Sequence, residues 1–403
     1  MVSLYSKSNK SKILINNLIL LLLPLGLILS DWIIGIFSVG DFLFFSILLI
    51  LLFTQNVFLE IMDYKILSLI SVYLAVNFFL NIEFNNNFDA NSAIAATIKI
   101  LYYSVFVLIT YRFLSIRNLE MSLLKYLNIY SILVILIGLY ISLAIYTGNL
   151  PFKFIWKLTR TDELSYFYNE TIRMRSVFSE PAHLGFYLNL NLSINLFFKR
   201  KINFTKYINL LLLGGIILTF SYSSIAIMII LILLYGVNLL LENGTFRFNK
   251  MAFIYMILIL LLIYISHDFL YKSLIERSFS IINGEDGSAS SRIFGSWEYV
   301  QQNNFLIGNG AGNTPPITNN FAYMISDLGI LPFLMSILFS GFILQRNVGL
   351  GLLFIFLNFQ KGGYLSPTLS VLIICVILYS KREKKFKSFE SKSTIGHDFK
   401  YNS

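Results

Sequence analysis

Long apolar runs are the feature of this sequence that most constrains its fold. Stretches of about 17–25 mostly apolar residues, the length with which a helix crosses the hydrocarbon core of a bilayer, recur along almost the whole chain. Only 13% of the 403 residues are charged and 56% are hydrophobic, whereas about 25% are charged in a typical soluble domain. The pattern excludes a soluble enzyme and a disulfide-stabilised secreted domain, and it predicts an all-α polytopic integral membrane protein.

The apolar runs predict about twelve transmembrane helices. The run 207–241 is too long for one crossing and is interrupted by the segment Ser221–Ser224, so we expect two helices joined by a tight turn. The expected spans are 13–30, 41–59, 65–81, 93–111, 126–147, 182–198, the two halves of 207–241, 251–266, 320–344, 347–359 and 364–380. They form a single membrane domain over 13–380, preceded by a short tail (1–12) and followed by a basic tail (381–403).

The positions of Lys and Arg orient the chain. With both termini in the cytoplasm, most of the 31 basic residues fall on the cytoplasmic side, as the positive-inside rule requires. This orientation places two long loops, 148–181 and 267–319, on the outer face, where Lys and Arg are normally scarce. These loops nevertheless carry Lys153, Lys157, Arg160, Arg173, Arg175, Lys272, Arg277 and Arg292. We therefore predict an anionic ligand at the outer face.

The first candidate site is the segment Arg173–Gly185, RMRSVFSEPAHLG, where the outer loop enters the sixth span. A helix start by itself accounts for Ser179 and Pro181 but not for the two arginines before them. Arginine offers fixed, paired donors that suit phosphate oxygens. Glu180 is a candidate to hold an arginine or to accept a hydroxyl proton. His183 is a candidate for the same role, or a packed interfacial histidine.

The second candidate site is the segment Ser290–Asn313. Arg292 lies against the orientation rule, close to Trp297, an aromatic of the type that gathers at membrane interfaces, and we predict that both contact substrate. The glycines of GNGAGN lack the strand–loop–helix context of a phosphate-binding loop, so a surface turn that leads into the next helix explains them better. Asn319 and Asn320 begin the next span and either bind sugar hydroxyls or cap the helix.

Other residues indicate neither metal nor thiol chemistry. The three histidines are scattered, so we expect no metal site and no cofactor. Cys375 is the single cysteine and lies within the last apolar run, where no intramolecular disulfide can form. Lys99 lies inside the fourth span and should pair with a carboxylate or line a cavity. The net charge of +10 comes largely from clusters that orient the helices, which excludes nucleic acid as the expected partner.

Taken in order, these segments resemble the bacterial O-antigen polymerases, which are grouped with the O-antigen ligases. The resemblance covers most of the chain and rests on RSVFSEPAHLG (Arg175 to Gly185), LTFSYSS (Leu218 to Ser224), Arg292 with Trp297 and GNGAGN, and NNFAYMISDLGI (Asn319 to Ile330). The sequence departs from the family at Tyr222 and Ser223, where members often carry an arginine.

The resemblance implies a fold similar to the glycosyltransferase C-type membrane fold, and transfer at the outer face of the bacterial cytoplasmic membrane. The donor is then a growing glycan on undecaprenyl pyrophosphate, and the acceptor is the non-reducing end of a newly flipped repeat unit. Positioned arginines stabilise the anionic leaving group without a metal. The expected catalytic residues are Arg175, Glu180 and Arg292, and the expected substrate-binding residues are Arg173, His183, Trp297 and Asn320.

Three other functions stay open at this point. A ligase would pass the same polymer to a lipid A core, and a shared fold does not fix the acceptor. A flippase for lipid-linked oligosaccharides would carry charges along a central path, whereas here they concentrate in the outer loops. A non-catalytic assembly protein would tolerate loss of the arginines. Besides the lipid-linked oligosaccharide and membrane lipid, the expected partners are a chain-length regulator and the repeat-unit flippase.

Overall fold

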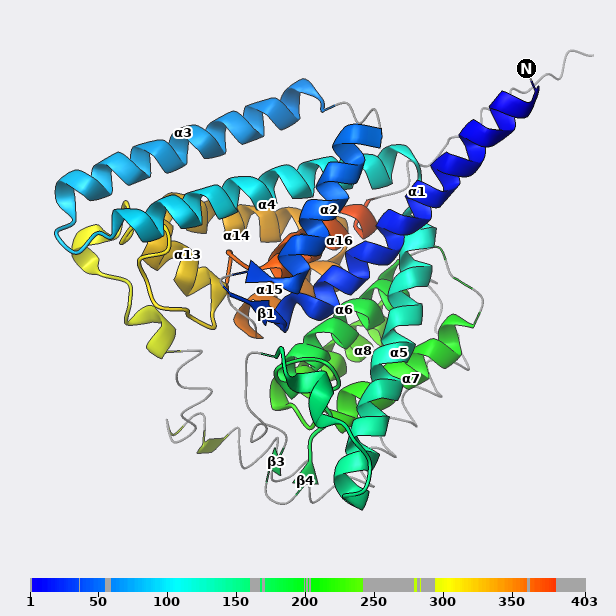
Figure 1. Ribbon diagram of the computed structural model, residues 1–403. Coiled ribbons are helices and arrows are strands. Elements are labelled where there is room, and N and C mark those ends of the chain that lie inside the picture. Colours follow the sequence, from blue (N-terminus) through cyan, green and yellow to red (C-terminus); the bar gives the residue numbers. More distant parts are fainter. Residues whose placement is uncertain are drawn as a thin grey trace, which may run out of the picture.

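A computed structural model describes residues 2–35, 37–54, 59–159, 167–168, 171–198, 200, 202, 204–241, 279–280, 283, 294–360 and 363–381. This part of the chain is mostly helical (Figure 1). The α-helices are α1 (Val2–Ile28), α2 (Val39–Thr54), α3 (Ile61–Phe84), α4 (Ala90–Ile116), α5 (Glu120–Thr147), α6 (Pro181–Phe197), α7 (Thr205–Leu218), α8 (Tyr222–Leu241), α13 (Asn320–Leu328), α14 (Ile330–Arg346), α15 (Val348–Gln360) and α16 (Pro367–Tyr379).

Four short strands and four 3-10 helices complete the described elements. Strands β1 (Ile33–Ile34) and β2 (Phe37–Ser38) form one antiparallel hairpin, and β3 (Phe167–Tyr168) and β4 (Thr171–Ile172) form another. The 3-10 helices are η1 (Leu29–Asp31), η2 (Lys153–Trp156), η5 (Gly295–Trp297) and η6 (Gln302–Asn304). The first hairpin directly follows α1 and η1, and it leads the chain into α2.

The composition of the helices is that of a membrane-embedded protein. Within the described residues, four helical segments are long and apolar enough to cross a bilayer: Ile13–Asp31, Ile61–Phe84, Ala90–Ile116 and Glu120–Thr147. Several shorter helices are also apolar. Only 17% of the most apolar window of α3 is buried, so side chains such as Val72 and Phe79 face outward. The predicted all-α membrane class is confirmed at this level.

Two expectations about single runs have different outcomes. The run 207–241 does split, because Thr219–Ser221 separate α7 from α8, and Phe220 reverses the chain in the left-handed region (φ 46°). The expectation of one helix over 320–344 was wrong, since the chain breaks at Gly329 between α13 and α14. A β-carbon at Gly329 would lie 2.3 Å from the carbonyl oxygen of Leu306.

The first helix is longer than the expected first span. Helix α1 already begins at Val2, so most of the expected N-terminal tail continues the first helix. The predicted span 251–266 lies outside the described residues, as does the basic tail after Lys381.

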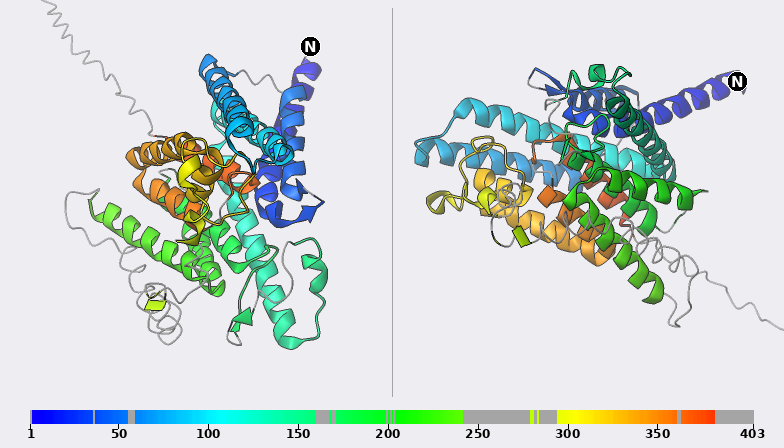
Figure 2. Two further views of the ribbon diagram at one scale, coloured as in Figure 1. Left: turned by 90° about the vertical axis from the view of Figure 1, so that its left-hand side faces the viewer. Right: turned by 90° about the horizontal axis from the view of Figure 1, so that it is seen from below.

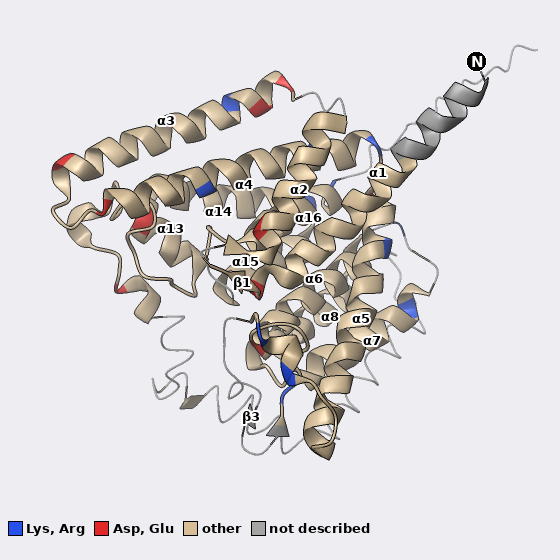
Figure 3. Ribbon diagram, in the orientation of Figure 1, with Lys and Arg blue, Asp and Glu red and all other residues tan. Residues whose placement is uncertain are grey.

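Helix α6 is the centre of the bundle. Nearly all of its residues are buried, because α5, α7, α8 and α15 pack around it. Helix α3 lies along α4 at the edge of the molecule (Figure 2). Lys and Arg lie mainly near helix ends, and long stretches between them carry no charge (Figure 3). Near the C-terminal end of α4, Arg112 forms a salt bridge with Asp63 on the first turn of α3, and its Nε lies 2.8 Å from Oδ2.

The contact between α6 and α8 depends on Gly185. A β-carbon there would lie 2.0 Å from Ser224 Oγ, so Gly185→Ala should force the helices apart and lower the free energy of unfolding by about 1–3 kcal/mol. The control is Gly214→Ala in α7, where nothing lies within 4 Å of the added β-carbon and the change should stabilise by up to about 1 kcal/mol. Thermal unfolding of the purified protein in detergent measures both, and equal melting temperatures would contradict the close contact.

Candidate functional site

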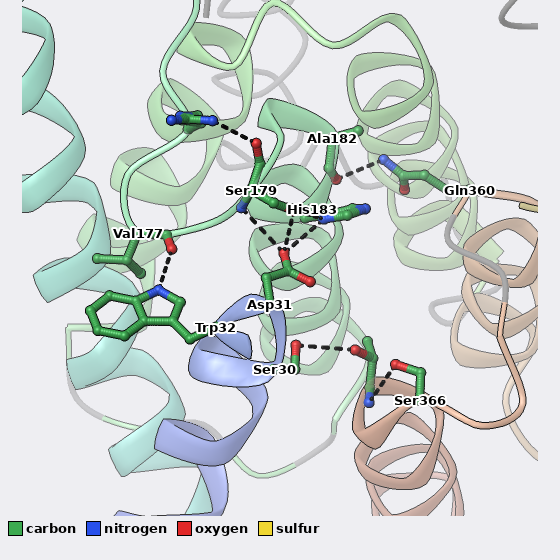
Figure 4. A network of polar contacts seen from close by, with 11 residues as sticks. Ser30, Asp31, Trp32, Val177, Ser179, Ala182, His183, Gln360 and Ser366 are labelled. Atoms are coloured by element: carbon green, nitrogen blue, oxygen red, sulfur yellow. Dashed lines mark hydrogen bonds and ion pairs between the residues drawn. The ribbon is translucent and has the colours of Figure 1, made fainter. Parts of the chain in front are cut away.

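The candidate functional site lies where α6 begins, next to η1 (Figure 4). Asp31, the last residue of η1, is buried, and its Oδ2 lies 2.7 Å from His183 Nδ1 on the first turn of α6. The same oxygen accepts hydrogen bonds from Ser179 Oγ (3.0 Å) and Ser179 N (3.3 Å). Ser179 Oγ is in turn 2.8 Å from His183 Nδ1. One carboxylate therefore fixes the start of α6 and the histidine together.

The contact with Asp31 favours one tautomer of the histidine. An ionised carboxylate only accepts hydrogen bonds, so we assign the Nδ1 proton of His183 to the bond with Asp31. The other ring nitrogen, Nε2, then carries the lone pair and is able to take up a proton. The side chain is 16% exposed, so it is not sealed within the bundle. A carboxylate behind a partly accessible imidazole is the arrangement of a general base.

Arg175 lies behind this pair and is almost fully buried, with 1% of its surface exposed. Its guanidinium carbon is 3.6 Å from the ring centroid of Trp156, and Nη1 donates to the carbonyl oxygen of Ser179 (2.8 Å). The indole of Trp156 is itself fixed, because Nε1 donates to the carbonyl oxygen of Ser176 (2.7 Å). Arg175 thus holds the loop that contains Ser179, and its positive charge lies next to the backbone of that residue.

Arg173 occupies a more open position than Arg175. It is half-buried, and Nε approaches the carbonyl oxygen of Thr219 at 3.5 Å. The backbone follows the same path, since Met174 N donates to the carbonyl oxygen of Leu218 (2.9 Å). The arginine segment and the turn between α7 and α8, which the sequence presents as separate motifs, therefore lie side by side.

The β1–β2 hairpin fastens the loop from the other side. Trp32 Nε1 donates to the carbonyl oxygen of Val177 (2.8 Å), and Ile33 N donates to that of Leu158 (2.9 Å). Between these anchors Ser176 adopts a left-handed backbone (φ 55°), a conformation that is costly for a residue other than glycine and is often found at functional sites.

The ends of two other helices, α15 and α16, also make hydrogen bonds at this site. Gln360, the last residue of α15, donates through Nε2 to the carbonyl oxygen of Ala182 (3.0 Å) and to Ser224 Oγ (2.7 Å). Thr368, on the first turn of α16, donates to Ser30 Oγ (3.3 Å). The N-terminal turns of α6, α8 and α16 and the last residue of α15 are therefore joined by hydrogen bonds beside the residues of the Asp31–His183 pair. Helix N-termini carry a partial positive charge that favours anions.

The remaining predicted residues have other environments. Glu180 is the N-cap residue of α6 and its side chain makes no capping bond. Trp297 lies in η5 with its ring centroid 6.1 Å from that of Phe333 on α14. Asn320 begins α13 and donates through Nδ2 to Asn358 Oδ1 (2.7 Å). Trp297 and Asn320 are thus held by α14 and α15 rather than by the Asp31 network, and Arg292 lies outside the described residues.

The glycine-rich turn serves the packing of α13. The backbone N–H of Gly310 donates to the carbonyl oxygen of Asp327 (2.9 Å) and that of Gly312 donates to Asp327 Oδ2 (2.8 Å). Thr314 N donates to Asp327 Oδ1 (2.8 Å). These amide protons are engaged within the protein, which favours a turn over a phosphate cradle, but the expectation of a surface turn was wrong because Gly308, Gly310 and Ala311 are buried. Within the described ranges, no group of three or more His, Cys, Asp or Glu residues is placed to hold a metal.

Asp31 is the residue of the candidate site that the sequence analysis did not single out. It stands directly after the first apolar run, 152 positions before its histidine partner, and no motif joins the two. The available signal was a carboxylate between a span and a tryptophan, in a connection otherwise poor in charge. Comparison of the chain with protein-family models, with curated proteins and with solved structures found no match.

Proposed function

We propose that this chain is a glycosyltransferase that polymerises the lipid-linked repeat units of an O-antigen or capsule polysaccharide. It would act at the outer face of the bacterial cytoplasmic membrane, with both termini in the cytoplasm and about twelve spans. The donor is the growing glycan on undecaprenyl pyrophosphate, and the acceptor is the non-reducing end of a new lipid-linked unit. The observation that carries the proposal is the Asp31–His183 pair at the start of α6, with a buried arginine behind it.

The proposed step needs a base, and the geometry favours His183. Its Nε2 takes the proton of the acceptor hydroxyl while the oxygen attacks the anomeric carbon of the donor sugar. The new bond forms as the bond between that carbon and the pyrophosphate oxygen breaks, and undecaprenyl pyrophosphate leaves with the electron pair. Asp31 stabilises the imidazolium that results. Glu180, the alternative base, lacks a partner of this kind among the described residues.

Cationic groups assist the departure of the pyrophosphate. Arg173 is the half-buried arginine at the site and is assigned the direct contact, with Arg292 as a second. Arg175 is a positioning residue that holds the loop before α6. The low dielectric around it strengthens the electrostatic interactions of its charge. Trp297 and Asn320 are assigned to the sugar chain on the side of α13. Positive helix ends favour the charge that develops on the leaving group.

The test is the glycan profile of a deletion strain that is rescued by the wild type or by Arg175→Ala. We expect the wild type to restore a ladder of long chains, and Arg175→Ala to leave single repeat units on the surface or on undecaprenol. The matched control is Arg346→Ala, because Arg346 also stacks on an aromatic ring, 3.9 Å from the centroid of Phe342, but belongs to the last turn of α14. It should restore the full ladder.

The other functions give different profiles in the same strain. Full-length polymer left on undecaprenol at the outer face indicates a ligase, and units trapped on the inner side indicate a flippase. Normal long chains from Arg175→Ala, at wild-type protein level, would refute the assigned site.

A further inference from the structure

Lys99 is an ammonium group within an apolar helix, and the structure gives it little compensation. It lies in α4, a helix long and apolar enough to cross a membrane. Its ionic partner is Asp41 Oδ2 at 3.8 Å, and the ring centroid of Tyr103 is 5.8 Å away. In the part of the chain that the structure describes, no hydrogen bond reaches the Lys99 ammonium. A charge of this kind inside a membrane marks a functional site unless it is fully paired.

Asp41 does not need Lys99 to satisfy its oxygen atoms. Its Oδ2 accepts from Ser38 N and Ser38 Oγ, both at 2.9 Å, and its Oδ1 accepts from the hydroxyl of Tyr103. These bonds fix the first turn of α2 to the hairpin and to α4. The three N–H donors of Lys99 are therefore available for another acceptor.

The Lys99 ammonium also has a path to the membrane. Its side chain is 29% exposed, and the same part of α4 carries Ile94 and Ile98, which are 48% and 63% exposed. Ala95, one turn closer to the start of α4, is exposed and too small to cover it. Side chains tilt toward the N-terminus of their helix, so the ammonium points to the end of the bundle at which α4 begins. Lysines at such positions extend their ammonium toward the polar head groups.

We propose that Lys99 binds the phosphate group of a membrane lipid whose hydrocarbon chain lies against Ile94 and Ile98. The phosphate oxygens would accept the hydrogen bonds for which the protein offers no acceptor. The negative charge of the phosphate would also balance the charge of the ammonium. The site lies next to Asp41, which follows β2 at the same open end of the β1–β2 hairpin as Asp31 but bonds to Ser38 and Tyr103 and not to His183. A phospholipid or a phosphorylated polyprenol fits this chemistry. The proposal is independent of glycosyl transfer.

The experiment measures lipids retained by the purified full-length protein in native mass spectrometry. The probes are undecaprenyl phosphate and a phosphatidylglycerol, each compared with its phosphate-free counterpart, undecaprenol or a diacylglycerol. Lys99→Gln should lower retention of the phosphorylated lipids about fivefold to tenfold, since one lysine contributes about 1 kcal/mol or somewhat more to such a contact. Lys99→Arg should retain them. The matched control is Lys65→Gln on α3, which should bind as the wild type does.

A second variant distinguishes loss of lipid binding from loss of the fold. Ala95→Leu leaves Lys99 and Asp41 in place but covers the path to the ammonium, and it should also lower retention. Equal retention of both phosphorylated lipids identifies a general lipid phosphate, and selective retention of undecaprenyl phosphate identifies the carrier; both support the site. Wild-type retention by Lys99→Gln or Ala95→Leu with an unchanged melting temperature overturns it and leaves Lys99 as the counter-ion of Asp41. Because no glycan is transferred in this assay, its outcome is separate from that of the proposed polymerase.

Discussion

Replacing His183 by asparagine should lower the rate of glycan transfer by about 10²–10⁴-fold, the range that general acid–base catalysis supplies. Asparagine places an amide donor close to the position of Nδ1, so the contact with Asp31 is conserved. It has no counterpart of Nε2, and therefore no atom to take the hydroxyl proton. The protein level in the membrane should be unchanged. The measurement is chain extension by the purified protein with a lipid-linked repeat unit as both donor and acceptor.

Two further variants make this result specific. Asp31→Asn should lose nearly as much activity, and the double variant should lose little more than either single one, because residues that act as a unit are strongly non-additive. Glu180→Gln should change the rate less than about tenfold if Glu180 is only the N-cap residue of α6, where its side chain makes no capping bond. The base would have to be reassigned to Glu180 if that variant fell by the larger factor while His183→Asn stayed near the wild type.

Replacing Arg175 by lysine should reduce turnover by about 10²–10³-fold, comparable to the loss of one donor that stabilises developing charge. Lysine keeps the charge but loses the planar contact with Trp156 and the fixed donor to the carbonyl oxygen of Ser179. Because Arg175 positions the loop, we expect the loss mainly in kcat, with KM for the lipid-linked unit little changed.

The control for this prediction is the same exchange elsewhere in the chain. Arg346→Lys replaces another ring-stacked arginine and should extend chains at the wild-type rate. Single-turnover measurements separate transfer from product release for both variants. A rise in KM with unchanged kcat in Arg175→Lys would mean that the guanidinium binds substrate directly and does not position Ser179.

The sequence predicted local features well, and the reason is physical. A membrane span consists of consecutive apolar residues, so α4 and α5 contain the expected runs 93–111 and 126–147 and extend them by at most six residues at either end. The split between α7 and α8 was also predictable, because length and charge placement both required it. The break at Gly329 was not, since it depends on the close approach of Leu306 from a distant loop.

The site was predictable only in part. Arg173, Arg175, Glu180 and His183 lie in one short segment, and any fold that begins a helix at Pro181 keeps them near each other. Asp31 joins them through the packing of η1 against α6, which no local pattern encodes. The burial of Arg175 follows from Trp156, a neighbour that the charge argument did not consider. The placement of charges led to the prediction of an anionic ligand, whereas tertiary contacts led to the proposed base.

The polar side chains along the buried helix α6 have a consequence for how the protein is made. Asn191 bonds to Ser131, and Asn195 to Asn128, both on α5, which is synthesised before α6. Asn189 bonds to the carbonyl oxygen of Ser224 on α8, which emerges later. When α6 leaves the translocon it already has partners for one part of its surface but not for the other. The buried surface of α6 is therefore covered completely only after α7, α8 and α15 have also been synthesised.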